Sequence, residues 1–256
     1  MMFNFFKREM QLEEEERYIP IGRNLLRVDN IKKYKDNNIL YKKKVESKAF
    51  IIERRGCIPD SITNSEDVLV PLFEIACKDT YGIINKNISS RRTKAELREK
   101  ISKTEDGEII RIISGSCIEH NTIRVTKANK ESILMAIGIL ENNHVGAKNI
   151  LINPLSSVYF RTLDKKIFKP YSYRKYRKTS CLGKLLGAKV WVSTRMLPQI
   201  ILFLPDKKYL GVLPINQKTS FRVFDELNNL KESIVAWESI GICLSNSDNI
   251  VKIIID

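Results

Sequence analysis

The last third of the chain, residues 187–256, most constrains the fold, because short apolar runs alternate there with turn-forming residues. Valine, isoleucine and aromatic residues dominate the runs, and proline, aspartate, asparagine and glycine separate them. Runs of this length and composition are typical of β-strands. The sequence therefore predicts strands at Lys189–Val192, Ile200–Leu204, Tyr209–Leu213, Ile234–Trp237 and Ile250–Ile255.

A long charged helix is predicted near residues 90–113. Leucine and isoleucine recur there on one broad face, with lysine, arginine and glutamate on the other. Ser89 or Ser90 is available as the N-cap, and Gly107 is a weak point near the middle. A continuous helix of about 20 residues would be ~30 Å long.

A second helix is predicted between two strands. Asn129 is expected to cap it, and apolar residues at helical spacing continue to Leu140. Strands are expected at 121–126, before this helix, and at 149–153, after it. Pro154 then starts a turn or a short helix.

The first third of the chain is polar and predicted to be extended. Residues 1–20 place aromatic side chains before a run of glutamates, which predicts a docking arm, a short helix or a frayed terminus. Residues 21–60 are rich in lysine, which predicts a basic two-stranded hairpin with little core of its own. Because an isolated hairpin is marginally stable in water, it is expected to lie on another subunit or on nucleic acid. Pro71 interrupts the apolar stretch 66–76, so an extended segment followed by a short strand or turn is expected there.

The chain is strongly basic, with a formal net charge of +14 over 256 residues. This charge favours polyanionic partners, although lysine is abundant throughout the chain and part of the charge is compositional. The densest basic stretch, residues 165–187, interleaves lysine and arginine with aromatic residues and is predicted to be a loop. That combination suits single-stranded nucleic acid through phosphate charge and base stacking, and a solvated or pore-lining loop is the alternative. The candidate nucleic-acid or axial-pore contacts are Lys169, Arg174, Lys175, Arg177 and Lys178.

No motif for catalysis or cofactor binding is present in the sequence. It lacks a phosphate-binding loop, a dinucleotide-binding glycine motif, a nucleophile elbow and the helix motif of zinc proteases. Cys117 and His120 have the spacing of metal ligands, but no second pair accompanies them, so no metal or cofactor is expected. Acidic neighbours such as Glu105-Asp106 lie in polar contexts, which predicts surface carboxylates and leaves a metal-dependent nuclease as an alternative.

Cysteine usage indicates a reducing compartment. The five cysteines are dispersed and form no CxxC pair, which predicts reduced, mostly buried thiols. No apolar run reaches the ~20 residues of a membrane span, and the N-terminus lacks the features of a secretory signal. We therefore expect a protein made and kept in the cytoplasm, with no membrane partner.

Four stretches resemble the major capsid proteins of tailed phages of the Hong Kong 97 type and the related encapsulins. Residues 68–76 look like the segment that enters the long spine helix in some of these proteins. Residues 133–153 are similar to the helix, turn and strand that open the family's axial domain, and Gly187–Pro198 matches a later stretch of that domain. The run 209–213, followed by 237–246, resembles the closing strands.

The resemblance implies an α+β capsid fold with five parts. These are an N-terminal arm, an extended loop, a peripheral domain with the spine helix, an axial domain, and closing strands that the two domains share. The implied limits, in that order, are 1–38, 39–60, 61–128, 129–232 and 233–256. No long helical scaffolding segment precedes the arm, so any scaffold is expected to be a separate protein.

The resemblance also implies that the extended loop reaches over a neighbouring subunit. One branch of the family cross-links a loop lysine to an asparagine, but neither an acceptor asparagine nor a catalytic glutamate stands out here, and no cross-link is predicted. The implied inter-subunit residues are Tyr41, Lys42, Lys43, Lys44, Lys48, Phe50, Arg54 and Arg55.

The function that the resemblance implies is structural rather than enzymatic. The chain would assemble through pentamers and hexamers into an icosahedral shell that encloses double-stranded DNA. A portal and a separate scaffolding protein would be further partners, and the protein would be found in the virion capsid after assembly in the host cytoplasm. An encapsulin-like compartment shell and a basic nucleic-acid-binding protein remain alternatives.

Overall fold

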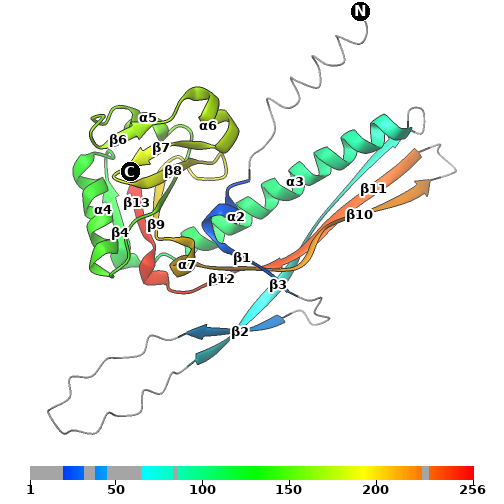
Figure 1. Ribbon diagram of the computed structural model, residues 1–256, viewed down its shortest axis with the longest axis horizontal. Helices are drawn as coiled ribbons and strands as arrows, with labels where there is room; N and C mark the ends of the chain where they lie inside the picture. Colours follow the sequence, from blue (N-terminus) through cyan, green and yellow to red (C-terminus); the bar gives the residue numbers. More distant parts are fainter. Residues whose placement is uncertain (1–19, 32–37, 45–64, 83–85, 227–230) are drawn as a thin grey trace, which may run out of the picture.

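The structure, a computed structural model, describes residues 20–31, 38–44, 65–82, 86–226 and 231–256. Two β-sheets and one long helix organise this part of the chain (Figure 1). The long helix runs beside the strands of the first sheet, and the second sheet forms a compact body at one end of them. None of the helices in these ranges combines the length and the hydropathy that a membrane span needs.

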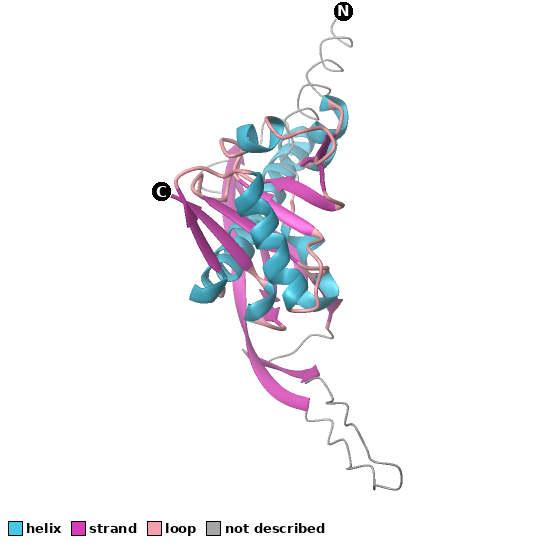
Figure 2. Cartoon of the chain, turned by 90° about the vertical axis from the view of Figure 1, so that its left-hand side faces the viewer, coloured by secondary structure: helices cyan, strands magenta, loops and turns pink. Residues whose placement is uncertain are grey.

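The first sheet contains long strands from distant parts of the sequence. Its order is β1-β10-β11-β3-β2, and β12 pairs with the start of β10. Only β1 and β10 pair in parallel. Figures 1 and 2 show one end of β3 leaving the rest of the molecule to pair with β2. The strands are β1 (Arg27–Asn30), β2 (Asn38–Lys44), β3 (Ser65–Gly82), β10 (Gly211–Glu226), β11 (Lys231–Gly241) and β12 (Cys243–Leu244).

β3 is an 18-residue strand that passes through Pro71. The short strand or turn expected after this proline is therefore wrong. β3 changes partner at this point, because residues 65–71 pair with β2 and residues 72–82 pair with β11. The missing N–H of the proline falls where one ladder ends and the next begins, so it interrupts neither.

The long helix α3 (Lys86–Gly115) has 30 residues and is about 45 Å long. It extends past both ends of the predicted 90–113, and Ser89 and Ser90 lie inside it rather than at its N-cap. Contacts with β3 and β11 bury its apolar face, and this burial outweighs the ~1 kcal/mol that Gly107 costs a helix. Its most buried apolar residues include Leu97, Ile101, Ile109 and Ile113.

The second sheet, here called the body sheet, has seven strands in the order β4-β13-β9-β5-β8-β7-β6. β5 pairs with β8 in parallel, as β4 does with β13, and the other neighbours are antiparallel. The strands are β4 (Thr122–Val125), β5 (Asn149–Ile152), β6 (Phe168–Pro170), β7 (Cys181–Leu185), β8 (Ala188–Val192), β9 (Ile200–Leu204) and β13 (Val251–Ile255).

The helix α4 (Lys130–Asn142) begins where the sequence predicts. Asn129 Oδ1 accepts a hydrogen bond from Ser132 N at 2.8 Å, and Ser132 Oγ accepts one from Asn129 N at 3.1 Å. This reciprocal capping box satisfies two amides at the helix start. The predicted strands on either side are confirmed as β4 and β5, and the short helix α5 (Ser157–Arg161) follows Pro154.

Two predictions for the second half of the chain are wrong. The run 209–213 is not one strand, because Asp206 caps a helical turn, α7 (Lys207–Leu210), and β10 begins after it. The basic stretch 165–187 is not a loop, because it contains β6, α6 (Tyr173–Thr179) and β7. The other apolar runs are confirmed as parts of β8, β9, β11 and β13.

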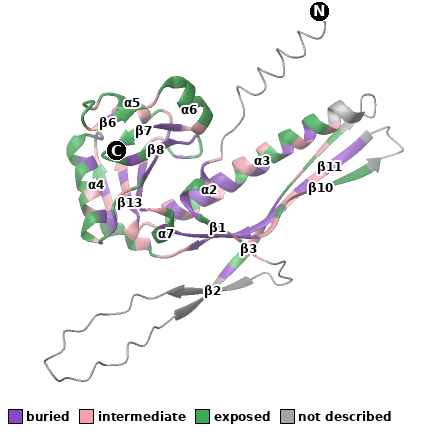
Figure 3. Ribbon diagram, viewed as in Figure 1, coloured by how far each residue is buried: buried purple, intermediate pink, exposed green. Residues whose placement is uncertain are grey.

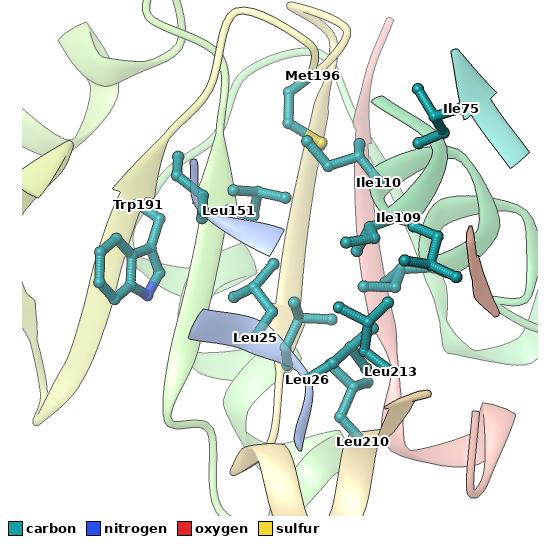
Figure 4. Close-up of a cluster of buried hydrophobic side chains, with 14 of the residues drawn as sticks. Leu25, Leu26, Ile75, Ile109, Ile110, Leu151, Trp191, Met196, Leu210 and Leu213 are labelled. Carbon is teal, nitrogen blue, oxygen red and sulfur yellow. The ribbon is translucent and has the colours of Figure 1, made fainter. Parts of the chain in front are cut away.

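Two hydrophobic clusters lie on opposite faces of the body sheet. Alternation along β5 sends Ile150 and Ile152 into one cluster and Leu151 into the other. The first cluster includes residues of α4 and α5. The second joins the body sheet to α3 and to a short helix at the start of the described chain, α2 (Gly22–Leu25). Figure 3 shows buried residues on strands of both sheets and along α3. Figure 4 shows Leu25 in the second cluster.

Candidate assembly and nucleic-acid surfaces

The N-terminal end of the described chain is fixed to the middle of α3. The amides of Ile21 and Gly22 donate to the carboxylate of Asp106 at 2.8 and 2.7 Å. Leu25 and Leu26 are fully buried beside α3 and β10. We call residues 20–30 the arm segment. The donors to Asp106 are backbone amides, which leave no side-chain motif for this contact in the sequence.

A buried ionic cluster lies next to this attachment. Arg23 Nε and Nη2 donate to the Glu105 carboxylate at 2.8 to 3.1 Å, and Nη2 also donates to Glu238 Oε2 at 3.1 Å. Thr219 Oγ1 donates to the same Glu238 oxygen at 2.9 Å. Glu105 and Glu238 are 1% and 0% exposed, whereas the Arg23 side chain is 38% exposed. The cluster therefore joins α2, α3, β10 and β11.

The surface position expected for Glu105 and Asp106 is wrong. Both are buried, because the arm segment covers the face of α3 that carries them. Burial raises the pKa of the Glu105 carboxyl, and the neighbouring Glu238 carboxyl raises it further, while Arg23 acts in the opposite direction. Sequence reasoning missed Arg23 and Glu238, since both pair with residues more than 80 positions away.

The predicted inter-subunit loop is only partly within the described residues. Residues 41–44 belong to β2, where their backbones pair antiparallel with residues 68–65 of β3. This ribbon projects from the rest of the molecule (Figure 2). The other implied contacts, Lys48, Phe50, Arg54 and Arg55, lie outside the described residues.

The basic segment 165–187 forms a folded surface on the body sheet. Cys181, Leu182 and Leu185 of β7 are buried, as is Phe168 of β6, which anchors the segment. α6 has the sequence YRKYRKT, contains no acidic residue and buries none of its side chains. The segment holds eight lysines or arginines and no aspartate or glutamate.

The five candidate contacts in this segment are all exposed. Lys169 lies on β6, and Arg174, Lys175, Arg177 and Lys178 lie on α6. Lys175 Nζ lies 3.6 Å from the centre of the Tyr171 ring, and Arg177 Cζ lies 5.8 Å from that of Tyr173. The Tyr173 ring is exposed and the Tyr171 ring is half-buried, and cations beside such rings form a surface that can hold phosphates and stack bases. The structure therefore brings these residues together on one short helix and its flanking strand.

No third metal ligand joins Cys117 and His120 among the described residues. Cys117 Sγ lies 3.3 Å from the carbonyl oxygen of Ile250, and His120 is exposed on a short turn. No group of three or more potential metal ligands occurs within the described ranges. Burial raises the pKa of the thiols of Cys77, Cys117 and Cys181, which favours their protonated form at neutral pH.

Comparison with known proteins finds similarity in structure alone. No protein-family model and no curated protein sequence matches the chain. The capsid of the cyanophage P-SCSP1u superposes with a TM-score of 0.67 at 9% identity, covering 93% of this chain and 88% of that one. The capsid of an empty GTA particle superposes with a TM-score of 0.70 at 10% identity, covering 93% of this chain and 90% of that one.

An encapsulin structure is similar to nearly the same degree. The holo-SrpI encapsulin complex from Synechococcus elongatus PCC 7942 gives a TM-score of 0.64 at 10% identity, covering 90% of this chain and 85% of that one. Capsids and an encapsulin thus superpose on this chain over most of the length of each protein. The chain therefore has the α+β, Hong Kong 97-type capsid fold.

Proposed function

We propose that the chain is a major capsid protein, which self-assembles through pentamers and hexamers into an icosahedral shell around double-stranded DNA. The observation that carries this proposal is the match to shell-forming proteins over about nine-tenths of both chains. Shell formation is a property of the whole fold rather than of a local motif.

The projecting β2–β3 ribbon supports assembly. Residues 65–71 of β3 pair with β2 alone among the described strands. Two-stranded ribbons are marginally stable in water, so this one gains from burial against a second copy of the chain. We assign the inter-subunit role to residues 39–60, which include the ribbon residues Tyr41, Lys42, Lys43 and Lys44.

The two sheets suggest how the shell domains divide. We assign the peripheral domain to α3 with the first sheet, and the axial domain to the body sheet with α4, α5 and α6. β10 pairs with β1 and β11, so residues 211–226 go with the peripheral part rather than with the axial range 129–232 that the sequence implied. β13 lies in the body sheet, so the chain crosses back to the axial part after β11.

We assign polyanion binding to the basic surface of α6. In a virion, the partner would be packaged DNA or anions at an axial pore. A portal and a separate scaffolding protein would complete the assembly, which would take place in the host cytoplasm.

An encapsulin-like compartment is the second candidate function, because the SrpI encapsulin matches nearly as well as the phage capsids do. The two functions differ in what the shell contains. Nucleic acid extracted from particles made in the native host would support the capsid, and a co-purified folded enzyme would support the compartment.

Electron microscopy of the full chain, alone and after co-expression with its genomic neighbours, tests the proposal. Closed particles, rings of five or six subunits, or tubes would support it. A monomer under both conditions would overturn shell formation. If that monomer also bound DNA in a salt-sensitive manner, a basic nucleic-acid-binding protein would be the better description.

A further inference from the structure

The buried cluster of Arg23, Glu105 and Glu238 contains more negative than positive charge. Two carboxyl groups are almost fully buried and share one guanidinium, which itself reaches solvent. Glu238 Oε2 accepts from Arg23 and Thr219, whereas no group in the described chain donates a hydrogen bond to Glu238 Oε1. A buried carboxylate oxygen without a donor is costly, and a second uncompensated charge in the same place is more so.

We propose that Glu105 and Glu238 hold one proton between them while the arm segment is docked, and that losing this proton releases the arm segment from α3. With one proton, the pair carries a single negative charge, which Arg23 neutralises. Without it, a net negative charge is buried beneath the arm segment. Undocking relieves that charge, because it exposes both carboxylates to water.

Each element that packs against Glu105 and Glu238 contributes a polar or charged group. α2 contributes Arg23, and α3 contributes Asp106, which is already bound by the Ile21 and Gly22 amides. β10 contributes the hydroxyl of Thr219. β3 contributes the thiol of Cys77, whose pKa is raised by burial and also by the charge of Glu238. Arg23 is therefore the one cation that hydrogen-bonds to the pair within the described residues.

The direction in which docking depends on pH follows from the raised pKa of Glu105 in the docked state. Burial raises the pKa of the docked Glu105 above the ordinary value of a glutamate, which the carboxyl would regain if undocking exposed it to water. The docked state then binds more protons than the undocked state, so docking is strongest at low pH. Its stability is lost as pH rises through the docked pKa. This behaviour is opposite to that of an exposed salt bridge, which weakens as acid protonates the carboxylate.

Docking of the arm segment is a property of the folded subunit and does not depend on shell formation. In a shell, the arm segment would be held to α3 at low pH and loosened at high pH.

Two measurements on the full chain test the proposal, and both can be made on the subunit or on the particle. Infrared absorption of protonated carboxyl groups should persist at pH 6, where an exposed glutamic acid is almost fully ionised. Hydrogen exchange in the peptide spanning residues 20–30, corrected for the intrinsic pH dependence, should then report docking. Its protection should fall by up to about tenfold per pH unit across the transition, the slope for release of one proton.

Glu105→Gln and Glu238→Gln supply the variants. Each should abolish the persistent carboxyl absorption and flatten the pH dependence of protection. Glu108→Gln is the matched control, because Glu108 lies one turn away on α3 in a partly exposed pair with Arg111. This control should behave as the wild type does.

Several results would overturn the proposal. One is a wild-type protein whose carboxyl absorption disappears below pH 6, or whose protection in residues 20–30 does not change between pH 5 and 9. Another is persistence of the absorption and of the pH dependence in both folded glutamine variants. If one variant fails to fold, the other and the wild-type titration still decide the question.

Discussion

The indole Nε1 of Trp191 donates a hydrogen bond to Oδ1 of Asn149 at 2.9 Å, across the parallel pair β5 and β8. The amide of the same asparagine donates to the carbonyl oxygen of Pro205 at 3.2 Å, just after β9. Both side chains are 8% exposed. One asparagine therefore ties together three neighbouring strands at the end of the body sheet where β5 begins.

Replacing this asparagine should destabilise the protein measurably. Asn149→Ala leaves the buried Trp191 N–H and the Pro205 carbonyl without their partner, which should cost about 1–3 kcal/mol. Urea unfolding followed by tryptophan fluorescence measures the change. Asn142→Ala is the control, because Asn142 is exposed at the end of α4. Equal stability of the two variants would show that the bond contributes little.

The strands of the body sheet were predictable because their signal is local. Consecutive apolar residues bounded by turns occur at Ile200–Leu204 and Lys189–Val192. These runs form β9 and most of β8. β10 was not predictable in full, because residues 216–226 are mostly polar. They are held as a strand by their antiparallel ladder with β11, the next strand along the chain, rather than by a run of apolar residues.

The candidate surfaces, too, were only partly predictable from the sequence. The basic residues of α6 were visible as a cluster in the sequence, although their helical form was not. Glu105 looked like a surface residue because its neighbours on α3 are polar. Residues 20–26 dock over it, and nothing near Glu105 in the sequence indicates that contact.

Gly22 is required where the arm segment meets α3. An added Cβ would lie 2.4 Å from Ile109 Cδ1 and 2.8 Å from Asp106 Oδ1. Ile109 is fully buried and Asp106 is held by two amides, so neither can move freely. Gly22→Ala should therefore destabilise the protein by about 1–3 kcal/mol and reduce protection of residues 20–30 from hydrogen exchange.

Gly138→Ala provides the comparison for that substitution. Gly138 lies in α4, and an added Cβ there meets no atom within 4 Å in the described chain. Alanine should stabilise this helix by roughly 0.5–1 kcal/mol. If Gly22→Ala also left stability unchanged or higher, the close packing of the arm segment on α3 would be contradicted.

The capping box of α4 should also be measurable. Asn129→Ala removes the acceptor for Ser132 N and should cost about 1 kcal/mol. Asn129→Asp keeps an acceptor at the same position and should retain most of the stability. Thermal unfolding of the two variants beside the wild type makes the comparison. A loss in the aspartate variant as large as in the alanine variant would argue against the cap.

The basic surface of α6 is expected to bind polyanions through phosphate charge. Replacing Arg174, Lys175, Arg177 and Lys178 together with glutamine should weaken duplex DNA binding. It should also reduce the slope of log K against log salt by up to about 3.6, since each lost phosphate contact contributes ~0.9. Fluorescence anisotropy with a labelled duplex, at several salt concentrations, measures both quantities. The subunit fold should be unchanged, because the four replaced side chains are exposed.

The control for this variant removes the same charge elsewhere. Lys127, Lys130, Lys148 and Lys207 are exposed and lie outside the basic segment. Changing these four to glutamine lowers the net charge equally, so a loss of binding that depends on total charge alone would appear in both variants. A smaller salt slope confined to the α6 variant would locate the contacts on this helix. Equal slopes in the two variants would instead mean that the chain attracts DNA through its overall charge, and α6 would then be only a solvated basic helix.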